Sequence, residues 1–246
     1  LVQFDAPGQR LWSEAIRYTG SGYYALNFRC RSAIATMEAI VAAGGSASHE
    51  PSYWEVNEQV AVRDSMNQDP DGICLDVFSY DRGGELRGPL DTEVSVLQTV
   101  AIATRDVPRS AAFYRGLGFE VLFDRVLDFP GLQALLGADQ PVRIHNINLM
   151  KDGNIVPGRV EMFGYLDMEH LPDAPLRDQA VPPNLGILSA SLASSDLDAD
   201  CARLCELGAE PVARASVSLP GFGPCQVATL FGPDGELLEL FCRSGS

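Results

Sequence analysis

Apolar and polar positions follow one pattern in three blocks of this chain, at about residues 20–80, 94–166 and 184–243. Each block predicts a strand, a helix and then three more strands. In the first and last blocks the helix carries apolar residues one turn apart and ends at a glycine, Gly44 or Gly208. The pattern therefore predicts a threefold βαβββ repeat.

The spacing of two turns supports this repeat. A Pro-Asp-Gly turn followed by strand-forming residues closes the first and last blocks, and it places Asp71 and Asp234 163 positions apart. The two helix-ending glycines lie 164 positions apart, so these blocks repeat in register.

The middle block starts with an apolar strand at 97–104. Asp106 is a candidate N-cap, and Pro108 falls in the first helical turn. Three strands follow, FEVLFDRV, VRIHNINLM and GRVEMFGYL, and the block ends near residue 166.

The composition limits the classes of partner that the protein is expected to bind. The chain has 246 residues, of which 46% are hydrophobic, and a net charge of −15. This charge disfavours nucleic-acid and anionic-membrane partners. The sequence shows no apolar run of membrane-spanning length and no signal peptide at its start, so we expect a soluble, cytoplasmic protein with reduced cysteines and a small-molecule ligand.

The middle and last blocks resemble a known superfamily. The segments DVPRSAAFYRGLGFEV, LSASLASSDLDADCARLCELGAE and GPDGELLELF are similar to the vicinal oxygen chelate superfamily. Glyoxalase I, extradiol dioxygenases, methylmalonyl-CoA epimerase and the fosfomycin and bleomycin resistance proteins belong to it. The resemblance implies an α+β fold, in which βαβββ modules form cup-shaped mixed β-sheets with the helices outside.

The resemblance also suggests a division into domains. We expect a first domain at 1–90 that lacks most of its first module, and a second at 94–246 built from modules 94–166 and 184–243. Residues 1–5 look like the last strand of an incomplete module, because the offset from Leu1 to Met162 is close to the repeat period. We therefore expect roughly 60 further residues upstream in the natural protein.

In metal-binding members each module supplies a ligand from its first strand, usually His or Gln, and an acid from its last strand. The resemblance places these acids at Glu161 and Glu239, as metal ligands or as catalytic groups. It places the first-strand residues at Thr99 and Ser189, neither of which is an imidazole. In the first domain the matching positions are Ala25 and Asp76, which gives that half little potential as a metal site.

Two interpretations of the acids remain open. In the first, the site holds a divalent metal, Mg²⁺, Mn²⁺, Zn²⁺ or Fe²⁺, and two carboxylates with two hydroxyls suit Mg²⁺ or Mn²⁺ better than Zn²⁺. Alternatively, Glu161 and Glu239 act without a metal, as a general acid and base that face each other across the cup. His145 either adds an imidazole to the site or lies on the outer face of its strand. His49 and His170 fall in loops and are expected to be solvated or structural.

Several aromatic residues are candidates for the wall of the ligand cavity. Phe163 and Tyr165 share a strand face with Glu161, and Phe241 shares one with Glu239. Phe222 lies between two glycines in the loop 218–226. It either closes over the cup or belongs to an ordinary hairpin turn.

The sequence leaves three functions open. The first is a lyase or isomerase of the glyoxalase type with an altered metal site, and the second is a ligand-sequestering protein like the bleomycin-resistance branch. The third is a relative of the ring-cleaving dioxygenases, whose two-histidine, one-carboxylate triad is missing from the matched positions. Pairing between two copies of the chain is a further possibility.

Overall fold

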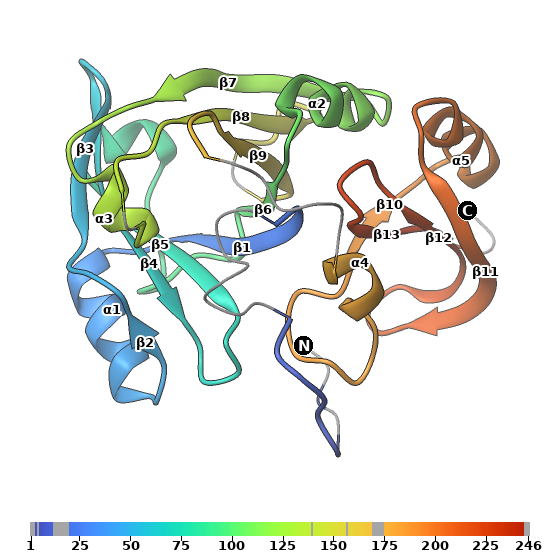
Figure 1. Cartoon of the computed structure of the whole chain (residues 1–246). Helices are drawn as coiled ribbons and strands as arrows, with labels where there is room; N and C mark the ends of the chain where they lie inside the picture. Colours follow the sequence, from blue (N-terminus) through green and yellow to red (C-terminus); the bar gives the residue numbers. More distant parts are fainter. Residues whose placement is uncertain are drawn as a thin grey trace.

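The computed structural model describes residues 3, 5–11, 20–138, 140–155, 157–168 and 175–243, and the strands form two sheets (Figure 1). The larger sheet has nine strands in the order β2-β4-β5-β1-β6-β9-β8-β7, with β3 paired to β4. The smaller sheet has the order β10-β13-β12-β11.

The bounds of the elements follow the predicted blocks. The strands are β1 (Gly22–Arg29), β2 (Ser46–Ala47), β3 (Ser52–Asn57), β4 (Val60–Gln68), β5 (Cys74–Arg82), β6 (Thr99–Ala103), β7 (Phe119–Leu127), β8 (Ile144–Lys151), β9 (Arg159–Tyr165), β10 (Ala190–Ala193), β11 (Glu210–Leu219), β12 (Gly223–Phe231) and β13 (Leu237–Arg243). The α-helices are α1 (Ala33–Ala42), α2 (Val107–Arg115), α3 (Leu132–Leu136), α4 (Pro175–Gln179) and α5 (Leu197–Glu206). None of these helices is long and apolar enough to cross a membrane.

Three modules share one topology, and the predicted α+β fold class is confirmed. In each module the first strand pairs in parallel with the last: β1 with β5, β6 with β9 and β10 with β13. Between them, α1, α2 and α5 begin at Ser32, Asp106 and Asp196, whose side chains accept a hydrogen bond from the backbone N–H three residues later. These caps satisfy N–H groups that a helix start would otherwise leave unpaired.

The modules pair differently from the predicted domains. β1 runs antiparallel to β6, with Leu26 opposite Val100, so the modules at 22–82 and 99–165 form one continuous sheet. The predicted division separated these two modules and joined 94–166 to 184–243 instead. The sequence repeat does not decide between the two arrangements, because the first strand of every module offers a similar edge for pairing.

The third module packs against the second (Figure 1). Ile102 and Met162 of the larger sheet share a buried apolar cluster with Leu204 of α5 and with Leu238 and Leu240 of β13. Arg203 of α5 also donates to the carbonyl of Gly116, at the end of α2, at 2.8 Å. Burial of these apolar side chains from both sheets stabilises the contact between the modules.

A buried polar cluster crosses the same contact. Asp234, in the Pro-Asp-Gly turn, accepts hydrogen bonds from Thr104 at 2.6 Å and Ser110 at 2.5 Å. Glu236 accepts one from the Tyr114 hydroxyl at 3.0 Å, and desolvation, together with the charge of Asp234, raises the pKa of Glu236 to about 8. We call these five side chains the inter-module cluster.

The expectation about an incomplete first module concerns residues 1–5. Leu1, Val2 and Phe4 lie outside the described residues.

Candidate functional site

The larger sheet curls into a cup. Arg125 on β7, at one end of the sheet, donates from Nη1 to the carbonyl of Val56 on β3, at the other end, at 2.6 Å. The cup holds an outer cavity of about 310 Å³, at the lower end of the size range of small-molecule sites, and an adjoining inner cavity of about 80 Å³. The side chains that line both cavities are Asn27, Trp54, Asp64, Asp76, Asn146 and Glu161.

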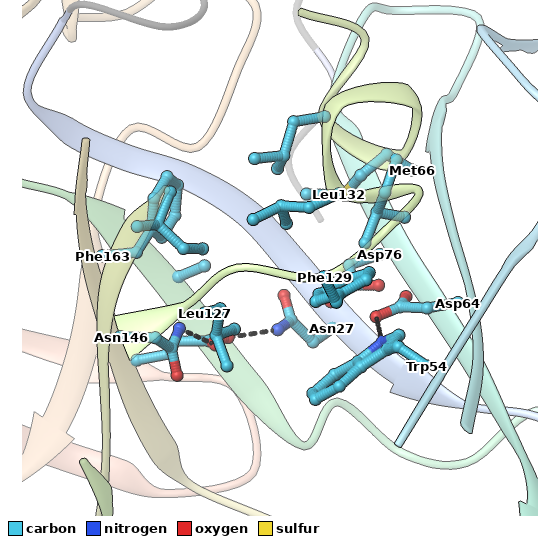
Figure 2. A pocket seen from close by; sticks show the side chains of 15 residues that line it. Asn27, Trp54, Asp64, Met66, Asp76, Leu127, Phe129, Leu132, Asn146 and Phe163 are labelled. Carbon is cyan, nitrogen blue, oxygen red and sulfur yellow. Dashed lines mark hydrogen bonds between the residues drawn. The ribbon is translucent and has the colours of Figure 1, made fainter. Parts of the chain in front are cut away.

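Glu161 on β9 is held by two amides. Asn27 of β1 donates from Nδ2 to Oε2 at 2.6 Å, and Asn146 of β8 donates from Nδ2 to Oε1 at 2.6 Å (Figure 2). Desolvation raises the pKa of Glu161, while the hydrogen bond from Asn146, the charge of Arg159 and the hydrogen bond from Asn27 oppose that rise. The amides thus fix the orientation of the carboxyl group and favour its ionised form.

Asp64 and Asp76 form a carboxyl pair on the neighbouring strands β4 and β5. Desolvation raises the pKa of Asp76 well above its usual range, and the charge of Asp64 raises it further. Desolvation also raises the pKa of Asp64, against hydrogen bonds from Asp76 and from the Trp54 indole, which lies 3.2 Å from Asp64 Oδ2. The pair therefore keeps a shared proton to a higher pH than an isolated carboxyl group would, because two buried carboxylates this close repel each other.

Five side-chain oxygens of the cup are buried without a hydrogen-bond partner. They come from five strands, and all of their residues line the outer cavity: Asn27 Oδ1, Asp64 Oδ1, Asp76 Oδ1, Thr99 Oγ1 and Asn148 Oδ1. Buried polar atoms in folded proteins are normally paired, so such a group marks the place of a missing partner. We call these atoms the unpartnered oxygens.

The inner cavity is otherwise apolar. The rings of Trp54 and Phe129 stack with centroids 5.0 Å apart and an interplanar angle of 11°. Phe163 and the α3 side chains Leu132 and Leu135 complete this wall beside the carboxyl groups (Figure 2). The cup therefore presents an apolar surface next to polar groups, an arrangement that suits an organic molecule.

The comparisons with known proteins point to one fold. Glyoxalase I from Zea mays aligns with 92% of this chain and 70% of its own, at 19% sequence identity and a TM-score of 0.58. A glyoxalase family protein from Bacillus cereus aligns over its full length with 64% of this chain, at 17% identity and a TM-score of 0.52. The chain has the glyoxalase fold of the vicinal oxygen chelate proteins. No protein-family model matches the sequence, and no curated protein matches it significantly.

Within this glyoxalase fold, three of the residues singled out from the sequence line the cup. Glu161 and Thr99 line the outer cavity, and Glu161 and Phe163 line the inner one. Tyr165 is buried behind the wall, with its ring 5.9 Å from that of Phe163.

The structure does not bring Glu239 to the cup. Glu239 lies on β13 in the smaller sheet, where Ser191 rather than Ser189 donates to it at 2.8 Å. Phe222 and Phe241 lie in the same sheet region, with ring centroids 4.8 Å apart. The proposed acid and base pair of Glu161 and Glu239 is therefore not assembled, because the two acids belong to different sheets.

The histidines lie away from the cavities. His145 alternates with Asn146 and Asn148, which line the cup, and its Nε2 lies 2.8 Å from Asp124 Oδ1 on β7, outside the cup. His49 is exposed in a loop. His170 lies outside the described residues.

Sequence reasoning missed several residues of the cup. Asp76 belongs to the predicted first domain, for which the sequence indicates little potential as a metal site. Asn27, Asp64 and Asn146 are not among the predicted site residues. Period-2 alternation could have placed Asn27 on the same face as Ala25, and Asn146 on the face opposite to His145. The convergence of these residues depends on the pairing of β1 with β6, which no local pattern along the chain indicates.

The resemblance implies a metal centre of the kind found in the metal-binding members of the superfamily, but the residues of this cup do not fit one with an imidazole ligand. Asp76, Thr99 and Glu161 occupy three of the expected positions, while Ala25 at the fourth has no donor atom. Each carboxyl oxygen of Glu161 already accepts an amide N–H. Across the described residues, no three His, Cys, Asp or Glu side chains are grouped so as to hold a metal ion.

Proposed function

We propose that this protein binds a small organic molecule with an aromatic or carbonyl-containing body in the cup of the larger sheet. The observation that carries the proposal is the combination of unpartnered polar atoms with a stacked aromatic wall in adjoining cavities. The apolar body would bury its surface against Trp54 and Phe129, while the polar end would pair with the unpartnered oxygens.

A screen of small aromatic and carbonyl compounds by melting temperature tests this proposal, since a ligand that binds the folded state raises the melting temperature. Phe129→Ala removes half of the aromatic stack and should abolish the shift. Phe222→Ala removes a half-exposed aromatic residue from the smaller sheet and should leave it unchanged. Shifts that disappear in Phe222→Ala and persist in Phe129→Ala would contradict the proposal.

Proton transfer, as in a glyoxalase-type isomerase or lyase, is a second candidate function. One observation favours it: an amide-oriented carboxyl group and a carboxyl pair with raised pKa values line the same cavity. Glu161 would remove a proton from the carbon beside a carbonyl. The proton of the Asp64–Asp76 pair would pass to the carbonyl oxygen and give a neutral enol, and return of a proton to carbon would give the product.

Deuterium uptake from D₂O into a panel of 2-oxo and 2-hydroxy carbonyl compounds tests this chemistry by mass spectrometry. We expect Glu161→Gln to lower the exchange rate by about 100-fold or more and Glu239→Gln to leave it unchanged. Equal exchange in the wild type and Glu161→Gln would exclude Glu161 as the base.

A further inference from the structure

The unpartnered oxygens of the cup define the polar end of its ligand. Burying a hydrogen-bonding atom without a partner costs free energy, and five such atoms line one cavity. Two of them belong to side chains that are almost fully buried, Thr99 at 1% exposure and Asn27 at 6%. The cup therefore favours a ligand that donates several hydrogen bonds.

Four of the side chains that carry donors near these oxygens use them in hydrogen bonds within the protein. The amide N–H groups of Asn27 and Asn146 bind Glu161, the indole N–H of Trp54 binds Asp64, and Arg125 binds the Val56 carbonyl. Turning the Asn27 amide over would place its oxygen against the Glu161 carboxyl group, so that contact fixes Asn27 Oδ1 as an acceptor. These four donors therefore leave the unpartnered oxygens open to a ligand.

The negative charge of the cup favours a ligand with a positively charged group. Asp64, Asp76 and Glu161 line both cavities, and the inner cavity has no basic side chain in its lining. Arg125 and Arg159 line only the outer cavity, on β7 and β9. A positive group between Asp64 and Asp76 would reduce the repulsion between their carboxyl groups, whereas an anion would meet three acids.

We propose that the ligand carries a protonated amine, which donates its three hydrogen bonds among the oxygens of Asn27, Asp64, Asp76 and Thr99 while its apolar body lies against Trp54 and Phe129. This inference rests on the proposed binding function and adds the chemical class of the ligand. An ammonium group donates three hydrogen bonds and also interacts favourably with the face of an aromatic ring. A bare metal ion would use the oxygens but would leave the aromatic wall without an occupant.

Three probes of similar shape and different charge test the inference: phenethylamine, 2-phenylethanol and phenylacetate. Titration calorimetry of the full chain gives their affinities, and the fluorescence of Trp54 reports occupancy of the cup, with Trp54→Phe to identify its signal. We expect phenethylamine to bind at least about tenfold more tightly than 2-phenylethanol, because hydrogen bonds to charged groups are the stronger ones.

Variants locate the amine. The double substitution Asp64→Asn, Asp76→Asn should reduce the affinity for phenethylamine about tenfold and leave that for 2-phenylethanol unchanged. Thr99→Val removes one neutral acceptor and should reduce the affinity for phenethylamine several-fold. Glu38→Gln, which removes an exposed carboxyl group on α1, is the control for loss of an acid outside the cup and should have no effect.

The outcomes separate the two proposals. If 2-phenylethanol or phenylacetate binds as tightly as phenethylamine and quenches Trp54, the cup binds small molecules but the amine assignment is wrong. If no probe binds at millimolar concentration, the binding function fails as well. If Mg²⁺ or Mn²⁺ raises the melting temperature of the wild type and not of the double variant, the oxygens receive a metal ion, and the amine proposal is overturned.

Discussion

The larger and the smaller sheet contain the same module, yet the acid on the last strand lines the cup in the larger sheet and lies away from it in the smaller one. Glu161 and Glu239 hold equivalent positions, each on the last strand of its module. Glu161 receives hydrogen bonds from β1, which belongs to another module, and from β8. The partner of Glu239 is Ser191 of its own module. The comparison teaches that the acid of one module enters this site only where a second module faces it.

The largest expected effect on stability concerns the inter-module cluster, which lies at the contact between the two sheets. The folded-state pKa of Glu236 is raised to about 8. Its stabilising contribution is thus fully present below its unfolded pKa and is lost as the pH rises through 8, a difference of several kcal/mol. Urea unfolding from pH 5 to 8 should show falling stability in the wild type and a shallower fall in Glu236→Gln.

Glu239→Gln is the control for this experiment, since it removes a nearby carboxyl group that is bonded to Ser191. It should reproduce the pH dependence of the wild type. A slope that stays unchanged in Glu236→Gln would show that the free energy of unfolding is not linked to the protonation of Glu236.

The two equivalent acids should respond differently to truncation. Glu161→Ala leaves the amide N–H groups of Asn27 and Asn146 without their acceptor, and both asparagines are buried. We expect a loss of roughly 2–4 kcal/mol in the free energy of unfolding, measured in urea at pH 7. Glu239→Ala should cost less than about 1 kcal/mol. Similar losses in both variants would contradict the difference between the sheets.

Asp76→Asn should stabilise the unliganded protein at neutral pH. The folded-state pKa of Asp76 is raised well above its usual range by desolvation and by the charge of Asp64. The carboxyl group therefore lowers stability as the pH rises above its unfolded pKa, and its removal should add roughly 1–2 kcal/mol at pH 7 and nothing at pH 3. A gain of the same size at both pH values would point to packing rather than charge.

The smallest expected effects on stability come from replacing two buried threonines, one in the cup and one in the inter-module cluster. Thr99 in the cup has an unpartnered hydroxyl, whereas the Thr104 hydroxyl binds Asp234 and lies 2.8 Å from Ser110 Oγ. Thr99→Val should change stability by about 1 kcal/mol or less in the stabilising direction, and Thr104→Val should destabilise the protein by about 1–3 kcal/mol. Thermal unfolding of both variants decides this, and a destabilised Thr99→Val would show that its hydroxyl has a partner.

Local features of the chain were predictable from the sequence. Periodicity and turn residues located the three modules, and Asp106 was recognised as a helix N-cap. Alternation along β9 placed Glu161 and Phe163 on one face, and both line the inner cavity. These features depend on residues within a few positions of each other, so a single stretch of sequence determines them.

Module pairing was decided by the tertiary structure. Each of the first strands β1, β6 and β10 offers an edge for pairing, so the repeat alone allows several combinations, and the predicted pairing of 94–166 with 184–243 does not match the sheets. The antiparallel contact of β1 with β6 brings Asn27 and Asp76 to Glu161. Residues so far apart in sequence converge only after the strand edges have paired, and that choice depends on the packing of whole modules rather than on the pattern within any one of them.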